Sequence, residues 1–151
     1  MARRVFFSFH YQRDIWRMNI VRNSNMIDGA AAAGWHDASL WEEAKAKGPA
    51  AVQRLIDGGL AHTTVTVVCI GALTAGRRWV DYEIDKSIER GNKLLGLRIN
   101  HLKAPPANAP DPAGIVPKRL AGAGARVVTF TTADALGREV EGLFAARPRL
   151  I

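Results

Sequence analysis

The sequence predicts an α/β fold with a doubly wound parallel sheet, because β-rich apolar runs alternate with helical patterns along its 151 residues. Four β-rich runs cover residues 4–9, 64–70, 93–99 and 126–130. Three of them show little or no alternation, which is typical of parallel strands that helices cover on both faces. Strand and helix in alternation form right-handed βαβ units. We therefore expect a flavodoxin-like sheet inside a three-layer α/β/α domain.

The first half of the chain is expected to supply three strands. The first, residues 4–9, is followed by a helical stripe of Ile15, Met18 and Val21. A short strand around residues 37–40 would bring the sheet to five strands. A cleaner helical stripe precedes the run at 64–70, and its members are Val52, Leu55, Ile56 and Leu60.

Two more helices are expected in the second half. The first begins after Thr74, the predicted N-cap, and ends at Gly91. Its apolar stripe consists of Val80, Ile84 and Ile88. The last helix covers residues 132–146, and its stripe consists of Leu136, Val140, Leu143 and Phe144.

Residues 102–124 hold five of the seven prolines and predict an irregular excursion with at most one short helix around residues 117–120. Its length is unusual for a compact domain. One interpretation is a surface excursion that replaces the helix between strands four and five. The other is a mobile flap or partner-binding segment.

Length and composition indicate one globular domain over residues 1–151, with 48% hydrophobic and 23% charged residues. The apolar stretch behind the basic start is too short for an export signal, and no run approaches the roughly 20 apolar residues of a membrane span. Cys69 is the only cysteine, which excludes an intrachain disulfide or a thiolate metal cluster. We expect a cytoplasmic protein without a membrane partner.

The net charge is +7, but the 21 lysines and arginines are scattered, with no run longer than two. Such a charge favours solubility and attracts anionic phosphate ligands. The sequence contains neither an aromatic-studded basic strand pair nor a DNA-reading module. No nucleic-acid partner is expected.

Doubly wound sheets bind ligands outside the carboxyl ends of their strands, where the strand order reverses. This rule selects residues 8–11, after the first strand, and residues 71–74, before the third helix. Neither segment contains GxGxxG or GxxxxGK[ST]. A classical dinucleotide fold or a nucleoside triphosphatase is therefore not expected.

The third helical pattern carries the clearest candidate for chemistry. Trp79 and Glu83 are four residues apart, so they stack one turn above the other on one helix face. A carboxylate beside an aromatic ring in a cleft can stabilise the positive charge that develops at an anomeric carbon. The alternative is that Glu83 is a solvated carboxylate like the neighbouring Asp81, Asp85 and Glu89. Spacing alone favours this alternative.

The other polar candidates favour structural roles. The histidines at positions 10, 36, 62 and 101 lack metal-ligand spacing, so no metal site is expected. His36 and Asp37 could form a base and its orienting partner, but neighbouring strand residues point apart. Trp35 and Trp41 are more typical of a core than of a ligand platform. Cys69 is expected to be a small buried apolar residue.

Five segments in order carry a resemblance to a known family. They are RVFFSFHY at residues 4–11, DASLW at 37–41, VTVVCI at 65–70, RRWVDYEI at 77–84 and GNK at 91–93. Together, over residues 3–100, they resemble the TIR-like domain of the Thoeris ThsB antiphage defence family. The end of the first strand departs from common TIR domains, because it reads Ser-Phe-His where those read Ser-Tyr.

The resemblance implies a TIR fold and an enzyme of the NAD nucleosidase or ADP-ribosyl cyclase type. Members of the family remove nicotinamide from NAD and convert the remaining ADP-ribose into a cyclic isomer. That isomer is a second messenger for a separate effector protein. NAD is then the substrate and no cofactor is expected, while a phage-derived trigger and self-association are expected in activation.

The resemblance also implies the site residues. Glu83 corresponds to the catalytic glutamate, by its place in the Trp-x-x-x-Glu stretch. Ser8, Phe9 and His10 would lie at the nucleotide pocket. Further lining would come from Asp37, Ser39, Trp41 and Trp79.

Two rival functions remain open. One is a non-catalytic TIR-like or receiver-like interaction module, although a receiver needs acidic magnesium ligands that residues 8–10 do not offer. The other is an enzyme similar to nucleoside deoxyribosyltransferases, which also places a helix carboxylate at a sugar. Release of nicotinamide from NAD would separate these readings.

Overall fold

The computed structural model of the chain describes residues 4–22, 38–103 and 108–145, apart from the side chains of residues 22 and 38–40. Its sheet contains the parallel strands β1 (Val5–Ser8), β2 (Val65–Ile70), β3 (Lys93–Arg98) and β4 (Arg126–Thr129), in that spatial order. The four β-rich runs are thus confirmed as strands. β1 and β2 are buried along their whole length, as expected for strands covered on both faces.

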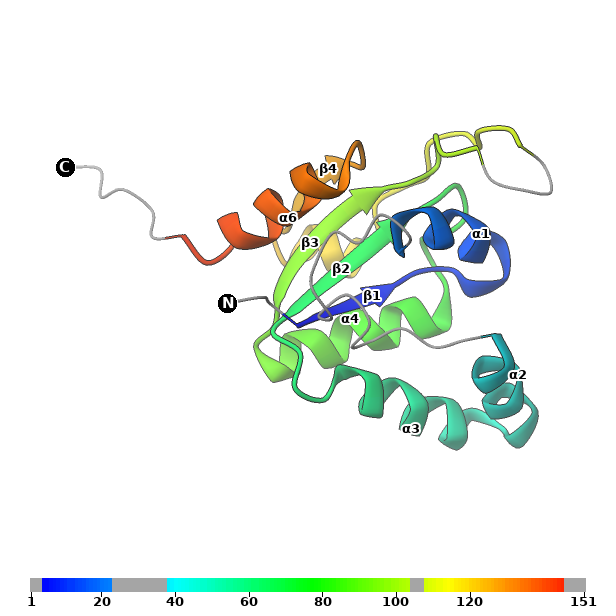
Figure 1. The fold of residues 1–151 in the computed structure, drawn as a ribbon. Coiled ribbons are helices and arrows are strands. Elements are labelled where there is room, and N and C mark those ends of the chain that lie inside the picture. Colours follow the sequence, from blue (N-terminus) through cyan, green and yellow to red (C-terminus); the bar gives the residue numbers. More distant parts are fainter. Residues whose placement is uncertain (1–3, 23–37, 104–107, 146–151) are drawn as a thin grey trace.

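Helices cover both faces of this sheet, as Figure 1 shows. On one face, α1 (Tyr11–Arg22) and α6 (Ala133–Gly142) pack through Met18, Val21, Leu136 and Val140. The other face carries α2 (Ala38–Lys47), α3 (Pro49–Leu60), α4 (Arg78–Arg90) and α5 (Lys118–Gly122). The predicted α/β architecture of three layers is therefore present.

The prediction of a short strand at residues 37–40 is wrong. Residues 38–40 begin α2, and residue 37 lies outside the described residues. Trp41 and Ala44 are three positions apart, and both are buried in one cluster with Phe6 and α3. A strand would point them to opposite faces, whereas a helix points both the same way. The described sheet has four strands, in the flavodoxin-like order without its second strand.

The C-terminal end of α4 is as predicted, but its N-cap is not. Gly91 closes the helix in the left-handed conformation, at φ 80°. Thr74 is not the N-cap, because Arg77 occupies that position without a side-chain capping bond. The Thr74 hydroxyl instead accepts the Gly71 N–H at 2.8 Å and so shapes the turn after β2.

The described part of the 102–124 excursion is anchored to α1. Arg17 Nε donates to the Leu102 carbonyl at 3.0 Å, and Arg17 Nη1 lies 3.0 Å from both Asp14 Oδ1 and Asp111 Oδ2. Arg13 adds a second ion pair to Asp111. The short helix expected near residues 117–120 is confirmed as α5. The excursion is thereby held against the end of the sheet where β2 and β3 finish.

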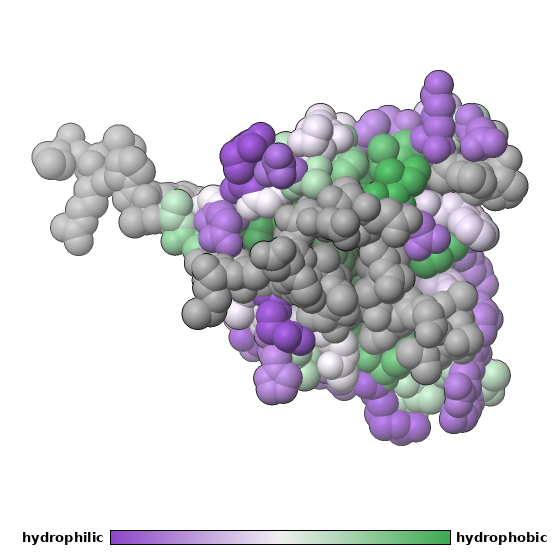
Figure 2. Space-filling model, in the orientation of Figure 1, coloured by the Kyte–Doolittle hydropathy of each residue, from purple (hydrophilic) through white to green (hydrophobic). Residues whose placement is uncertain are grey.

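The surface of the described residues mixes hydrophilic and apolar side chains, with hydrophilic ones along the outline of the molecule (Figure 2). No helix within the described ranges has the length and apolar character needed to cross a membrane.

Candidate active site

A pocket of about 260 Å³ lies at the carboxyl end of β1, between the segment after that strand, α2 and the first turn of α4. Its lining residues are Phe9, His10, Tyr11, Gln12, Trp41, Lys45, Arg77, Arg78, Trp79 and Val80. The position agrees with the rule that parallel α/β sheets bind ligands outside the carboxyl ends of their strands.

A buried pair, Ser8 and Glu83, lies directly next to this pocket. Ser8 is the last residue of β1 and precedes the lining residue Phe9, while Glu83 follows Trp79 by one turn of α4. Ser8 Oγ donates a hydrogen bond of 2.7 Å to Glu83 Oε1. Glu83 is 6% exposed and Ser8 is fully buried. Two segments 75 residues apart in the sequence thus place a hydroxyl on a carboxyl group.

Burial changes the ionisation of Glu83. Removal of the carboxyl group from water raises its pKa from 4.5 to about 8, although the hydrogen bond from Ser8 lowers it in part. Near pH 7 Glu83 is therefore protonated and uncharged. A carboxyl group with a pKa near the working pH can both give and take a proton, which is the property of a general acid–base group.

Aromatic rings form one wall of the pocket. Tyr11 stacks on Phe9 with ring centroids 6.0 Å apart and on Trp41 at 5.3 Å. Trp79 packs edge-on against Tyr82, and the Arg78 guanidinium lies 4.5 Å from the Trp79 ring centroid. Flat rings of this kind can stack with a nucleobase or a nicotinamide ring.

Positive charge gathers at the same pocket. Lys45, Arg77 and Arg78 are all part of the lining. The pKa of His10 is lowered by burial and then by the charges of Arg77, Arg13 and Lys45, so this imidazole is neutral near pH 7. With Glu83 protonated, the pocket has a positive field that favours an anionic ligand.

The structure brings most of the predicted site residues together. Phe9, His10, Trp41 and Trp79 line the pocket, and Ser8 and Glu83 lie beside it without being part of the lining. Asp37 lies outside the described residues, and the side chain of Ser39, in α2, is not described. The chemical roles of all eight stay predictions.

Six lining residues were not among the predicted site residues: Tyr11, Gln12, Lys45, Arg77, Arg78 and Val80. Lys45 follows Trp41 by four residues, so assigning residues 38–47 to a helix would have placed both on one face. Arg77 and Arg78 stand immediately before Trp79, where the first turn of α4 faces the pocket.

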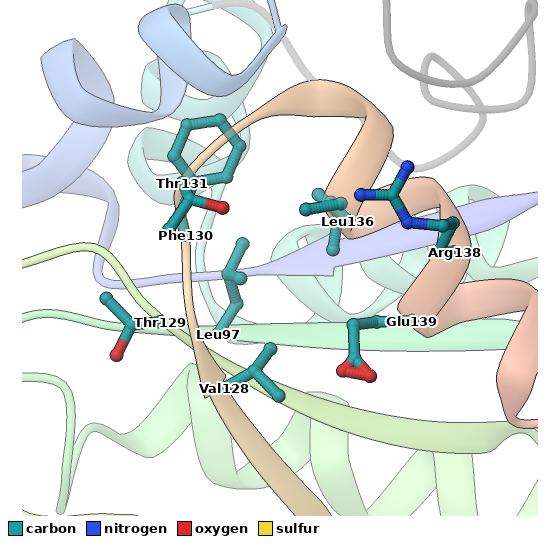
Figure 3. A pocket seen from close by; sticks show the side chains of 9 residues that line it. Leu97, Val128, Thr129, Phe130, Thr131, Leu136, Arg138 and Glu139 are labelled. Atoms are coloured by element: carbon teal, nitrogen blue, oxygen red, sulfur yellow. The ribbon is translucent and has the colours of Figure 1, made fainter.

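A second cavity, of about 300 Å³, lies between the end of β4 and α6 (Figure 3). Leu97, Val128, Phe130 and Leu136 give it an apolar base. Its charged lining residues are Arg138 and Glu139, and Glu139 is held by Arg126 at 3.1 Å. It is slightly larger than the first pocket but contains no residue from the end of β1 or the start of α4, so we do not assign the chemistry to it.

Comparison with known proteins identifies the family of the chain. The family model of the Thoeris protein ThsB, TIR-like domain, matches residues 6–104. A curated protein of Bacillus cereus (strain MSX-D12), named putative cyclic ADP-D-ribose synthase ThsB1, is 57% identical over 105 residues. The match covers 68% of this chain and 55% of that protein, so the chain spans about half the length of this relative. Glu83 and the whole pocket lie inside the matched family region.

Proposed function

The chain belongs to the family of the Thoeris protein ThsB, TIR-like domain, and from this premise we propose that it is an enzyme that cleaves the nicotinamide–ribose bond of NAD. The observation that carries the proposal is the buried Glu83 carboxyl group, bonded to Ser8 beside an aromatic and cationic pocket. The name of the Bacillus cereus relative, putative cyclic ADP-D-ribose synthase, supports the same substrate class.

Binding of NAD would ionise Glu83. The nicotinamide ring of NAD carries a positive charge, and a positive charge beside a carboxyl group favours its charged form. The pKa of Glu83, which burial raises to about 8, would therefore fall when the ring is bound. The carboxylate then forms where positive charge is about to move onto the ribose.

Cleavage breaks the bond between the anomeric carbon and the nicotinamide nitrogen, and the electron pair leaves with the neutral nicotinamide. The remaining ribosyl cation is stabilised by the Glu83 carboxylate, which the Ser8 hydroxyl holds in place. The low-dielectric surroundings strengthen this attraction.

Cyclisation follows when a nucleophilic group of the same ADP-ribose attacks the anomeric carbon in place of water. If that group is a hydroxyl, its proton passes to Glu83, which thereby returns to its protonated form. Exclusion of water by the folded substrate would decide between cyclisation and hydrolysis. The cyclic product would serve as a messenger for a separate effector protein, after activation by a phage-derived trigger.

The test is incubation of the purified protein with NAD, with nicotinamide measured by chromatography and the second product by mass spectrometry. A cyclic product has the mass of NAD less nicotinamide, whereas hydrolysis adds one water. Glu83→Gln should abolish nicotinamide release and keep the fold, because it removes the charge but little volume. Asp81→Asn and Asp85→Asn, on the same helix and both paired with Arg119, should have mild effects. Wild-type turnover by Glu83→Gln would refute the assignment.

A further inference from the structure

Resting on the proposed function, we propose that Lys45, Arg77 and the first turn of α4 form a subsite for the diphosphate of a dinucleotide. The subsite occupies the pocket wall beside Trp79, one helical turn before Glu83. It fixes which part of the substrate lies at which end of the pocket and predicts that a diphosphate compound binds more tightly than a nucleoside.

The charge of the pocket lining is one-sided. Lys45, Arg77 and Arg78 contribute three positive charges, and no aspartate or glutamate is part of the lining. Glu83, one helical turn after Trp79, is uncharged near pH 7 because burial raises its pKa to about 8. An anion that enters the pocket therefore meets cations and no carboxylate among the lining residues.

Several cations elsewhere on the described surface are paired, whereas others, such as Arg54, have no ion pair among the described residues. Arg13, Arg17, Lys47 and Arg126 each lie within 3.1 Å of a carboxylate oxygen. In contrast, neither Lys45 nor Arg77 is paired with a carboxylate of the described residues; Arg77 uses Nε to bind the Leu73 carbonyl at 3.0 Å. The Nη groups of Arg77 and the Lys45 ammonium are thus available to a ligand.

The start of α4 adds hydrogen-bond donors to these charges. The first N–H groups of a helix have no partner within the helix, and Arg77, at the N-cap, provides no side-chain acceptor for them. Residues 78–80, which carry these N–H groups, all line the pocket. The positive end of the helix dipole points the same way. Asp81, the acidic residue of this turn, is held by Arg119 at 2.9 Å.

The spacing along α4 fits a nucleotide. Trp79, in the first turn, precedes Glu83 by four residues, which is about 6 Å along a helix axis. A 5′-phosphate and the anomeric carbon of the same nucleotide are separated by an ester oxygen and part of the ribose, a comparable length. A diphosphate at the first turn of α4 therefore leaves the anomeric carbon within reach of Glu83.

Direct binding measurements test the subsite without need for catalysis. Calorimetry would compare ADP-ribose, ADP, adenosine and inorganic phosphate with the wild-type protein and four variants. Lys45→Ala and Arg77→Ala should each weaken ADP-ribose and ADP about tenfold or more, since each removes a charge-assisted contact. Lys47→Ala and Arg54→Ala are the matched controls, exposed cations of α2 and α3 outside the pocket, and should change affinity less than about twofold.

Lys45 and Arg77 are exposed, so their truncation should leave the melting temperature unchanged. The proposal is wrong if ADP-ribose does not bind, if adenosine binds as tightly as ADP, if inorganic phosphate alone binds as tightly as ADP, or if both pocket variants bind like the controls. Turnover of NAD is measured in parallel. If ligand binding depends on Lys45 and Arg77 but the protein releases no nicotinamide, the proposed function is refuted and the subsite is not. If both pocket variants turn NAD over with unchanged kcat/KM, the subsite is refuted and the proposed function is not.

Discussion

Ser8 Oγ donates a 2.7 Å hydrogen bond to Glu83 Oε1 at the junction of β1 and α4, and both residues are buried. The bond favours the charged carboxylate, while burial favours the neutral acid and is the larger effect. The free carboxyl group therefore has a pKa of about 8. The first two predictions follow from this balance.

The first prediction is a pH dependence of NAD cleavage. Because kcat/KM reports the ionisation of the free enzyme, it should rise about tenfold per pH unit below pH 8 and level off above it. The kcat profile should level off at lower pH, since bound nicotinamide stabilises the carboxylate. Initial rates of nicotinamide release from roughly pH 6 to 9 measure both. A kcat/KM profile already flat at pH 6 would contradict the raised pKa.

The second prediction concerns Ser8→Ala. Loss of the hydroxyl removes the bond that stabilises the charged form, so the midpoint of the kcat/KM profile should move to higher pH and kcat should fall. Ser87→Ala is the matched control, because Ser87 is also buried but bonds Thr66 and the backbone carbonyl of Glu83. A midpoint that moves equally in both variants would show that Ser8 has no specific role.

The third prediction is that Glu83→Gln makes the folded protein more stable near neutral pH. The pKa of Glu83 is about 8 in the folded protein, and its ordinary value, 4.5, applies to the unfolded chain. Its contribution to the free energy of unfolding is therefore fully present below pH 4.5 and is lost as the pH rises through 8. Between these values the unfolded chain gains about 1.4 kcal/mol of relative stability per pH unit. Glutamine, which never ionises, avoids this loss.

Urea denaturation checks the third prediction. The variant should exceed the wild type by roughly 3 kcal/mol in free energy of unfolding at pH 7, and the difference should shrink toward zero as pH approaches 4.5. Asp85→Asn is the control, since Asp85 is half exposed in an ion pair with Arg119 and should change stability by less than about 1 kcal/mol. Equal stability of Glu83→Gln and wild type at pH 7 would mean that Glu83 is ionised in the folded protein.

The sequence predicted the parts of the molecule that local patterns determine. Apolar runs located all four strands, and the spacing of Trp79 and Glu83 placed both on one helix face. It failed at residues 38–40, because a short segment with Trp41 fits a strand or a helix until packing against Phe6 decides. Thr74 failed as an N-cap for a similar reason, since its hydroxyl bonds backbone groups in the turn after β2.

The environment of Glu83 could not be predicted from the sequence, for a different reason. Its raised pKa depends on burial and on Ser8, which is 75 residues away in the chain. The positive lining likewise joins Lys45 of α2 to Arg77 at the start of α4, and only tertiary packing brings them to one pocket. Neighbours in space that are distant in sequence leave no local pattern.

The fourth prediction is that isolated protomers cleave NAD slowly and become active by contact with another protomer or a trigger protein. The pocket of about 260 Å³ is at the lower limit of ligand pockets, so the described residues do not enclose a whole dinucleotide. Nicotinamide release per molecule should therefore fall on dilution. Specific activity that stays high and constant over a wide dilution series, without a trigger, would contradict this.

The fifth prediction is that Gly114→Ala destabilises the contact between the 102–124 excursion and the end of β2. A Cβ on Gly114 would collide with the Gly71 carbonyl oxygen and lie 2.9 Å from that of Ala72. Backbone atoms cannot move aside as a flexible side chain can, and Gly71 itself abuts Asp14, which Arg17 holds. The excursion must therefore shift, at a cost of about 1–3 kcal/mol in free energy of unfolding.

Gly58→Ala is the matched control for this last substitution, because a Cβ on Gly58 meets nothing within 4 Å and the residue lies inside α3. Alanine there should stabilise the protein by about 0.5–1 kcal/mol, since glycine loses more conformational freedom in a helix. Urea denaturation of both variants measures the two opposite effects. A Gly114→Ala protein as stable as wild type would show that residues near 114 do not depend on their contact with Gly71, and that the ion pairs of Asp111 and the hydrogen bond from Arg17 to Leu102 are enough to hold the excursion in place.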